Sequence, residues 1–317
     1  MDHSSKPIIK HIPDFLDYCE VEKGLASRTQ ENYGRYLSLF AKWLEKEGRT
    51  PLLPHEFSSS DIWDYRLFLS REYKSKNGET LRKISQHYYL VALRALLDYF
   101  ADRDIAALPS SKVKLPKDAR TKMVKFLSLP QMRQLLETPD INKVQGLRDR
   151  AIIETLFSTG LRIAELTALN RNQIHFKDAE GLELTITGKG GTVRTIYFSP
   201  RSLEWIKKYV DTRTDIDPAL FINYRSKNAD SLRLSARSIE LSIKRYSILA
   251  GLPFAVTPHT LRHSYATDLL TQGVDLRTVQ EFLGHKNIAT TQIYTHVTNQ
   301  RLREIHKKFH GGNQLEE

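Results

Sequence analysis

Four side chains near the C-terminal end of the chain have the types and spacing needed for chemistry on a phosphate group. His259 and Arg262 are three residues apart, which places them about one turn apart on the same face of a helix. His285 directly follows Gly284, and Tyr294 comes nine residues later on a further short helical stretch. Arginine and histidine side chains can bind an anion such as a phosphate. A tyrosine hydroxyl next to that anion can then attack it as a nucleophile. No cysteine or acidic residue is spaced to share a metal with these histidines, so we predict no metal site.

Three short helices joined by tight turns must position these side chains. Thr257 is a good N-cap and Pro258 suits the first helical position, so a helix should begin there. Gly273 is typical of the residue that ends such a helix. Asp275 can then cap a second helix that ends at Gly284.

Taken singly, each of these residues has an ordinary structural explanation, but the combination is specific. The order H-x-x-R-H, then L-G-H, then a tyrosine nine residues on resembles the tyrosine recombinases, also called the phage integrase family. The stretch LGHKNIATTQIYTHV is most similar to the Xer branch. STGLRIAELTAL around Arg162, GKGGTVR around Lys189 and the N-terminal ASRTQENYGRYLSLFAKWL extend the resemblance over nearly the whole chain.

The resemblance implies cleavage of DNA strands by transesterification, without a cofactor. Tyr294 would attack the scissile phosphodiester and form a 3′-phosphotyrosyl enzyme with a free 5′-hydroxyl. Arg162 and Arg262 would bind the non-bridging oxygens as charge develops on them. The six catalytic residues that the resemblance implies are Arg162, Lys189, His259, Arg262, His285 and Tyr294.

The remaining three catalytic residues would bind the phosphate or move protons. The resemblance implies that His285 hydrogen-bonds the phosphate and that His259 helps to take the tyrosine proton. Lys189, at the tip of a hairpin turn, would protonate the 5′ oxygen. In the Xer turn a second basic residue commonly follows, whereas this chain has Thr192 there and Arg194 two residues further on.

Two successive strand exchanges pass through a Holliday junction, which implies a tetramer on two DNA sites. We expect double-stranded DNA with inverted half-sites as the partner, bound by a homotetramer or by a heterotetramer with a second recombinase. The similarity to the Xer branch implies resolution of chromosome dimers, while integration or excision of a mobile element remains open. The sequence alone also leaves three further classes of protein open, namely a type IB topoisomerase, a catalytically silent DNA-binding regulator and a generic RNA-binding module.

Composition agrees with a protein that acts on nucleic acid. The chain has 317 residues and a net charge of +11, and residues 1–120 carry 20 Lys and Arg against 17 Asp and Glu. Residues 121–317 carry 28 against 20, so the positive charge is spread over both parts and favours a polyanion. The single cysteine, Cys19, excludes an internal disulfide, and neither a secretory signal nor a membrane span is evident. We therefore expect a cytoplasmic, nucleoid-associated protein with no membrane partner.

The N-terminal part reads as four amphipathic helices, over residues 8–23, 28–47, 61–73 and 79–100. Such helices can bury one core as a small bundle. The resemblance implies that residues 1–106 are a SAM-like core-binding domain that clamps DNA. We expect Ser27 to cap the second helix. The candidate DNA contacts are Ser27, Arg28, Thr29, Lys83, Gln86, Arg94, Ser235 and Arg237.

The rest of the chain predicts a linker, 107–125, and a mixed α+β catalytic domain, 126–310. Alternating apolar residues predict a small antiparallel sheet, in which a strand at 182–187 returns through the glycine turn at 188–191. The predicted helices of this domain cover 128–136, 147–159, 162–169, 201–213, 236–250 and 298–309 besides the three short ones above. We expect residues 311–317 to be a disordered tail. The fold class is thus mainly α, in two domains.

Overall fold

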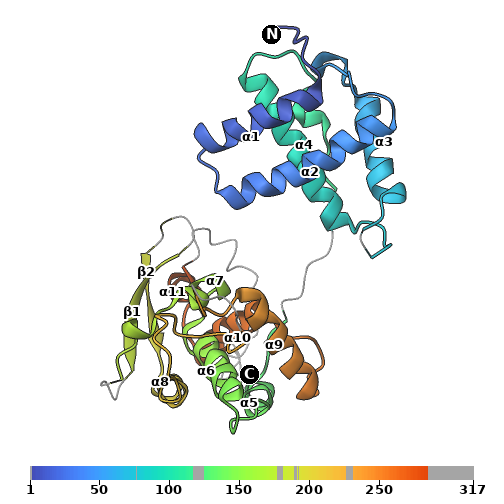
Figure 1. Cartoon of the computed structure of the whole chain (residues 1–317). Coiled ribbons are helices and arrows are strands. Elements are labelled where there is room, and N and C mark those ends of the chain that lie inside the picture. Colours follow the sequence, from blue (N-terminus) through green and yellow to red (C-terminus); the bar gives the residue numbers. More distant parts are fainter. Residues whose placement is uncertain are drawn as a thin grey trace, which may run out of the picture. The chain divides into compact units, whose positions relative to one another are not determined.

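The chain divides into two units, Met1–Thr121 and Lys122–Glu317 (Figure 1). The computed structural model describes residues 2–75, 77–116, 125–176, 181–188, 191, 193–225 and 231–284. Over these residues the chain is mainly helical with one two-stranded antiparallel sheet, which confirms the predicted fold class. None of the described helices is both long enough and apolar enough to cross a lipid bilayer.

Four α-helices build the first unit, as the amphipathic patterns predicted. A short 3-10 helix, Ile8–His11, leads directly into the first of them. The four are α1 (Ile12–Val21), α2 (Ser27–Lys46), α3 (Ser59–Leu67) and α4 (Lys83–Asp102).

Two helix starts differ from the prediction. Helix α3 begins before residue 61, because the Asp61 carboxylate accepts the Ser58 N–H at 2.8 Å and so fixes the N-terminus there. Its last turn continues as a π-helix over Phe68–Glu72. Helix α4 begins after residue 79, because Thr80 pairs with Lys74 in an isolated antiparallel bridge that holds the chain extended.

Ser27 does not cap α2, contrary to our expectation, because it is already the first helical residue and Ala26 occupies the N-cap position without a side-chain bond. A glutamine in the first turn binds the preceding chain instead. Gln30 Nε2 donates to the Leu25 carbonyl at 2.7 Å. The glutamine at the start of α4 does the same, since the Gln86 amide donates to the carbonyl of residue 81 at 2.8 Å.

Aromatic and aliphatic side chains fill the core of this unit. Phe40 and Tyr65 are fully buried and meet edge to face, with ring centroids 5.2 Å apart. Val113 also packs into this core and is 1% exposed. Part of the segment that we expected to be a linker therefore belongs to the packed first unit.

The second unit is built around α6, which several neighbouring elements cover. Helices α5, α8, α9 and α10 and strand β2 all pack against it. The sheet pairs β1 (Leu182–Thr187) with β2 (Val193–Phe198), and Leu182 lies opposite Phe198. The helices are α5 (Leu129–Glu137), α6 (Val144–Thr159), α7 (Ile163–Ala168), α8 (Pro200–Val210), α9 (Ala236–Leu249), α10 (Pro258–Gln272) and α11 (Leu276–Leu283).

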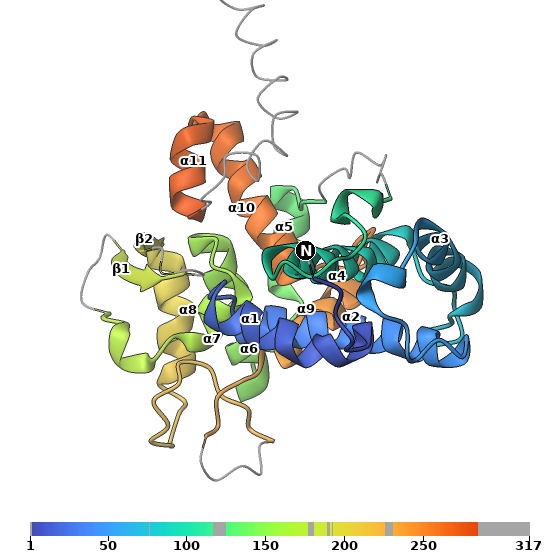
Figure 2. The same ribbon diagram turned by 90° about the horizontal axis from the view of Figure 1, so that it is seen from above.

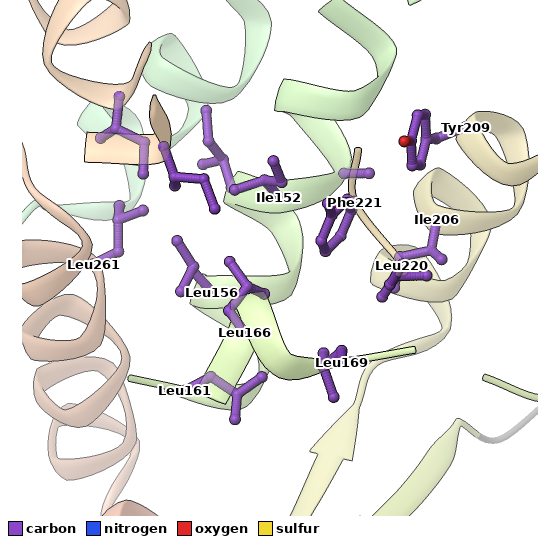
Figure 3. Packing of buried hydrophobic residues seen from close by; sticks show 14 of the residues in the cluster. Ile152, Leu156, Leu161, Leu166, Leu169, Ile206, Tyr209, Leu220, Phe221 and Leu261 are labelled. Atoms are coloured by element: carbon purple, nitrogen blue, oxygen red, sulfur yellow. The ribbon is translucent and has the colours of Figure 1, made fainter. Parts of the chain in front are cut away.

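The core of the second unit fixes the helices that carry the candidate site. Figure 3 shows Ile152 and Leu156 on α6 packed near Leu166 on α7 and Leu261 on α10. All four side chains are 2% exposed or less. Because a close-packed interior resists displacement, α7 and α10 are held rigidly relative to α6.

Candidate active site

The two arginines that we predicted as phosphate ligands come together at the end of α11. Arg262 is only 2% exposed, and its Nη2 donates to the Leu283 carbonyl at 2.5 Å. Arg162 lies just before α7, and its Nη2 donates to the Gly284 carbonyl at 3.1 Å. The two guanidinium groups, far apart in sequence, thus bind consecutive carbonyls directly before His285.

Local capping explains how α10 and α11 present these residues. The Thr257 hydroxyl accepts the Thr260 N–H at 3.1 Å, so α10 begins where the sequence predicted. The Asp275 carboxylate accepts the N–H groups of residues 277 and 278 at 2.9 and 3.0 Å. Gly273 and Gly284, both at positive φ, end the two helices, which lie side by side in Figure 2. The predicted boundaries of both helices are confirmed.

Gly160 joins α6 to this site. It ends α6 with φ of 60°, and its carbonyl accepts Arg262 Nη1 at 2.6 Å. A Cβ atom at this position would lie 2.5 Å from the Tyr265 ring. A glycine is therefore required both for the backbone conformation and for the space that the tyrosine ring occupies.

A buried carboxylate that the sequence analysis did not single out holds Arg162. Glu165 Oε2 accepts the Arg162 N–H at 2.8 Å, and Oε1 accepts Arg162 Nη1 at 3.0 Å. Burial alone would raise the pKa of Glu165, but hydrogen bonds from Arg194 and Arg162 outweigh it and lower the pKa from 4.5 to about 2. The only signal in the sequence was the spacing of three residues between Arg162 and Glu165 on a predicted helix.

A cavity of about 600 Å³ opens in front of the two arginines, between the starts of α7 and α10 and one face of α9. Arg237, predicted as a DNA contact, lies in its wall and pairs with Glu240 at 3.2 Å. Ser235, predicted alongside it, caps α9 by accepting the Ser238 N–H at 3.1 Å. The charged and ionisable residues that line the cavity are Arg162, Arg237, Glu240, Lys244, His259 and Arg262. Cations exceed anions in this set, so the cavity suits an anionic group.

His259 lines the same cavity and lies against His263, one turn further along α10. The two rings are nearly parallel, with centroids 5.2 Å apart. Although His259 as a residue is exposed, partial burial of its ring and the charges of Arg262 and Arg162 lower its pKa below 6.5. Deeper burial, with His259 and Arg262 nearby, lowers the pKa of His263 to about 4. His259 is therefore neutral near pH 7 and can accept a proton.

Three of the six predicted catalytic residues, Lys189, His285 and Tyr294, lie outside the described residues, as do the predicted helix 298–309 and the tail 311–317. Among the described residues, no group of three or more His, Cys, Asp or Glu side chains could hold a metal ion.

The remaining predicted DNA contacts belong to the first unit. Arg28 is exposed and pairs with Glu31 at 2.8 Å, and Lys83 is exposed at the start of α4. Thr29 and Arg94 are partly buried on α2 and α4. The structure thus brings Arg237 into the cavity of the second unit, while these side chains lie on the separate first unit.

The second unit is thus a helical domain with one two-stranded sheet and a cationic cavity lined by two convergent arginines and a histidine, which suits a protein that binds an anionic group such as a phosphate. Residues 125–301 match the Phage integrase family. The chain is 36% identical over 306 residues to tyrosine recombinase XerD of Lacticaseibacillus casei, covering 94% of this chain and 98% of that protein. It is 35% identical over 316 residues to tyrosine recombinase XerC of Pelotomaculum thermopropionicum, covering 95% and 97%. The chain therefore belongs to the phage integrase family, and it is a tyrosine-type site-specific DNA recombinase.

A solved structure of a recombinase has a similar fold. The XerH site-specific recombinase, bound to its palindromic difH substrate after cleavage, matches with a TM-score of 0.74 and 21% identity. The match covers 96% of this chain and 97% of that chain.

Proposed function

We propose that this recombinase resolves chromosome dimers, exchanging strands through a 3′-phosphotyrosyl intermediate formed by Tyr294. The observation that supports the chemical part of this proposal most directly is the convergence of Arg162 and Arg262 on the carbonyls that precede His285. Two guanidinium groups fixed before the substrate arrives can stabilise the charge that develops on a phosphate in the transition state.

Each proposed role follows from the chemistry of its side chain. The Tyr294 phenol, with an ordinary pKa of about 10, needs a base, and neutral His259 would take its proton. The phenolate oxygen would bond to phosphorus while the bond to the 5′ oxygen breaks. Lys189 would give that leaving oxygen its proton, and His285 would hydrogen-bond the phosphate. Attack by a 5′-hydroxyl from a partner duplex would reverse these steps and release Tyr294.

The relatives support an Xer-type task and an assembly of several protomers. Proteins named XerD and XerC match this chain almost equally well over nearly its full length, so the likeness itself does not select one of the two. We propose that the chain binds chromosomal DNA in the cytoplasm at inverted half-sites, as a homotetramer or as a heterotetramer with a second recombinase. In this proposal the first unit, including Arg28 and Lys83, clamps the duplex together with the second.

A DNA substrate nicked close to the scissile phosphate tests the nucleophile, because it traps the covalent adduct for a denaturing gel. Tyr294→Phe should abolish the adduct and leave duplex affinity almost unchanged, since phosphate contacts elsewhere dominate binding. Tyr197→Phe is the matched control, because Tyr197 is an exposed phenol on β2 that has no proposed role. An adduct that persists in Tyr294→Phe would assign the reaction to another nucleophile.

Footprinting on the flanking genomic DNA tests the proposed target. Two protected, inverted half-sites around a short unprotected spacer are expected from a pair of protomers on one site. Protection of a single half-site would contradict the proposed assembly.

A further inference from the structure

Arg194, the second residue of β2, is a buried cation. Its side chain is only 5% exposed. Its Nη1 donates to Glu165 Oε1 at 2.9 Å, and its Nη2 donates to Glu165 Oε2 at 2.7 Å. Two parallel bonds between a guanidinium and a carboxylate fix both the distance and the orientation of the pair.

The same carboxylate also holds Arg162, so the two arginines share one partner. Glu165 accepts from the backbone N–H and Nη1 of Arg162 on one side and from the fork of Arg194 on the other. Without the two hydrogen bonds from Arg194, the Glu165 carboxylate would be free to turn toward Arg162. The position of the Arg162 guanidinium therefore depends on a side chain of β2.

Arg194 also lies against the end of α11. A Cβ atom at Gly284 would lie 2.7 Å from Arg194 Cδ and 3.0 Å from its Nη1. The Gly284 carbonyl is the one that accepts Arg162 Nη2. One buried side chain thus binds the Glu165 carboxylate and lies against Gly284, and each of these accepts a hydrogen bond from the Arg162 guanidinium.

We propose that Arg194 is a positioning residue for strand cleavage, which acts by fixing Glu165 and, through it, Arg162. The inference rests on the phosphate-binding role proposed above for Arg162. Arginine is required at this position because lysine presents a single ammonium group and cannot form the two-bond fork. Arg194 lies on the strand that follows the Lys189 turn in the sequence, so the same side chain ties that strand to the two-arginine site.

Arg194→Lys tests the proposal, because it keeps the charge and removes the fork. Single-turnover cleavage of the nicked substrate at saturating protein should slow roughly tenfold to a hundredfold, as expected when a reacting group is misplaced. Duplex affinity in a gel shift should not change. Arg213→Lys is the matched control, because Arg213 is also buried and paired to a carboxylate, that of Asp215, and does not line the cavity. It should cleave at the wild-type rate, and thermal melts of both variants check folding at the assay temperature.

A double variant separates positioning from a general loss of structure. If Arg194 acts through Arg162, adding Arg194→Lys to Arg162→Lys should slow cleavage no further. The proposal is overturned if Arg194→Lys cleaves at the wild-type rate, if the two losses multiply, or if Arg213→Lys loses as much cleavage. Should Arg194→Lys melt below the assay temperature, Arg194→Gln is put through the same comparisons. Normal cleavage by Arg162→Lys and Arg162→Ala would instead defeat the phosphate-binding role of Arg162 itself.

Discussion

At the scale of single residues, the cavity keeps a histidine uncharged among cations. Ring burial and the charges of Arg262 and Arg162 lower the pKa of His259, so its neutral form prevails at physiological pH. His263, stacked on His259, has a pKa of about 4 and adds no charge near neutrality. A base of this kind suits a reaction whose nucleophile must lose a proton while the phosphate must stay surrounded by positive charge.

The pH dependence of cleavage should follow from this lowered pKa. With subsaturating protein, the rate of adduct formation should decline as pH falls from about 8, with a midpoint below 6.5, because the pKa of His259 in the free enzyme lies below its ordinary value. Single-turnover rates over a pH series measure this. His259→Asn is the control, since its residual rate should lack that decline. A midpoint at or above 6.5 in the wild-type protein would contradict the assignment.

Residue types and spacing predicted part of this site, and tertiary placement decided the rest. The structure places Arg162, His259 and Arg262 around one cavity. Spacing predicted that His259 and Arg262 share a helix face, and only the resemblance to the family joined Arg162 to them. Glu165 and Arg194 were not predicted as a pair, because their contact requires β2 to lie beside α7. No spacing within either element contains that information.

At the scale of secondary structure, the ends of helices carry the site. Both arginines bind carbonyls at helix C-termini, where the last carbonyls have no partner within the helix. Gly160 supplies one of these carbonyls to Arg262, and it has positive φ with the Tyr265 ring directly behind it. Any substitution that shifts the end of α6 should therefore also shift the Arg262 guanidinium.

Two glycine substitutions should separate backbone strain from steric clash. Gly251→Ala, at φ of 65° with nothing within 4 Å of the added Cβ, should cost about 1 kcal/mol of unfolding free energy from strain alone. Gly160→Ala, at φ of 60°, adds a clash with the Tyr265 ring and should cost roughly 2–4 kcal/mol in all. Urea unfolding of the full chain measures both. Equal losses would show that the Tyr265 ring moves aside without cost.

A helix start that a local cap sets can be predicted from the sequence, whereas one that a contact between segments sets cannot. Thr257 and Asp275 marked the starts of α10 and α11 because their side chains bind the next turn of the same helix. The start of α4 was missed because Thr80 pairs with Lys74 across a turn, a contact between segments that no cap signal reports. The start of α3 differs from the prediction although it also has a local cap, formed by Ser58 and by Asp61 three residues on.

At the scale of the whole molecule, both units carry excess positive charge, so neither alone accounts for the attraction to DNA. The excess is 20 Lys and Arg over 17 Asp and Glu in residues 1–120 and 28 over 20 in residues 121–317. Charge of this kind supplies affinity for any duplex. In the proposed function, ordered strand exchange would also need a contact between protomers that depends on where the nucleophile lies.

We propose that residues 298–309, which follow Tyr294 closely in sequence, supply this contact. Leu302, Ile305 and Phe309 recur at helical spacing and form a narrow apolar stripe. A stripe of this width suits packing against a neighbouring protomer, and a head-to-tail contact repeated around a ring would close a tetramer. The position of Tyr294 would then depend on assembly.

Truncation after Val297 tests this contact, because it removes the stripe and leaves Tyr294 in place. The truncated protein should bind a single site normally in a gel shift and should recombine two sites poorly, because phosphate contacts set binding while the ring sets synapsis. A second truncation, after Gly311, is the control and should recombine normally, since it keeps the stripe and removes only the last six residues. If the protein that ends at Val297 recombines at the wild-type rate, residues 298–309 do not link protomers.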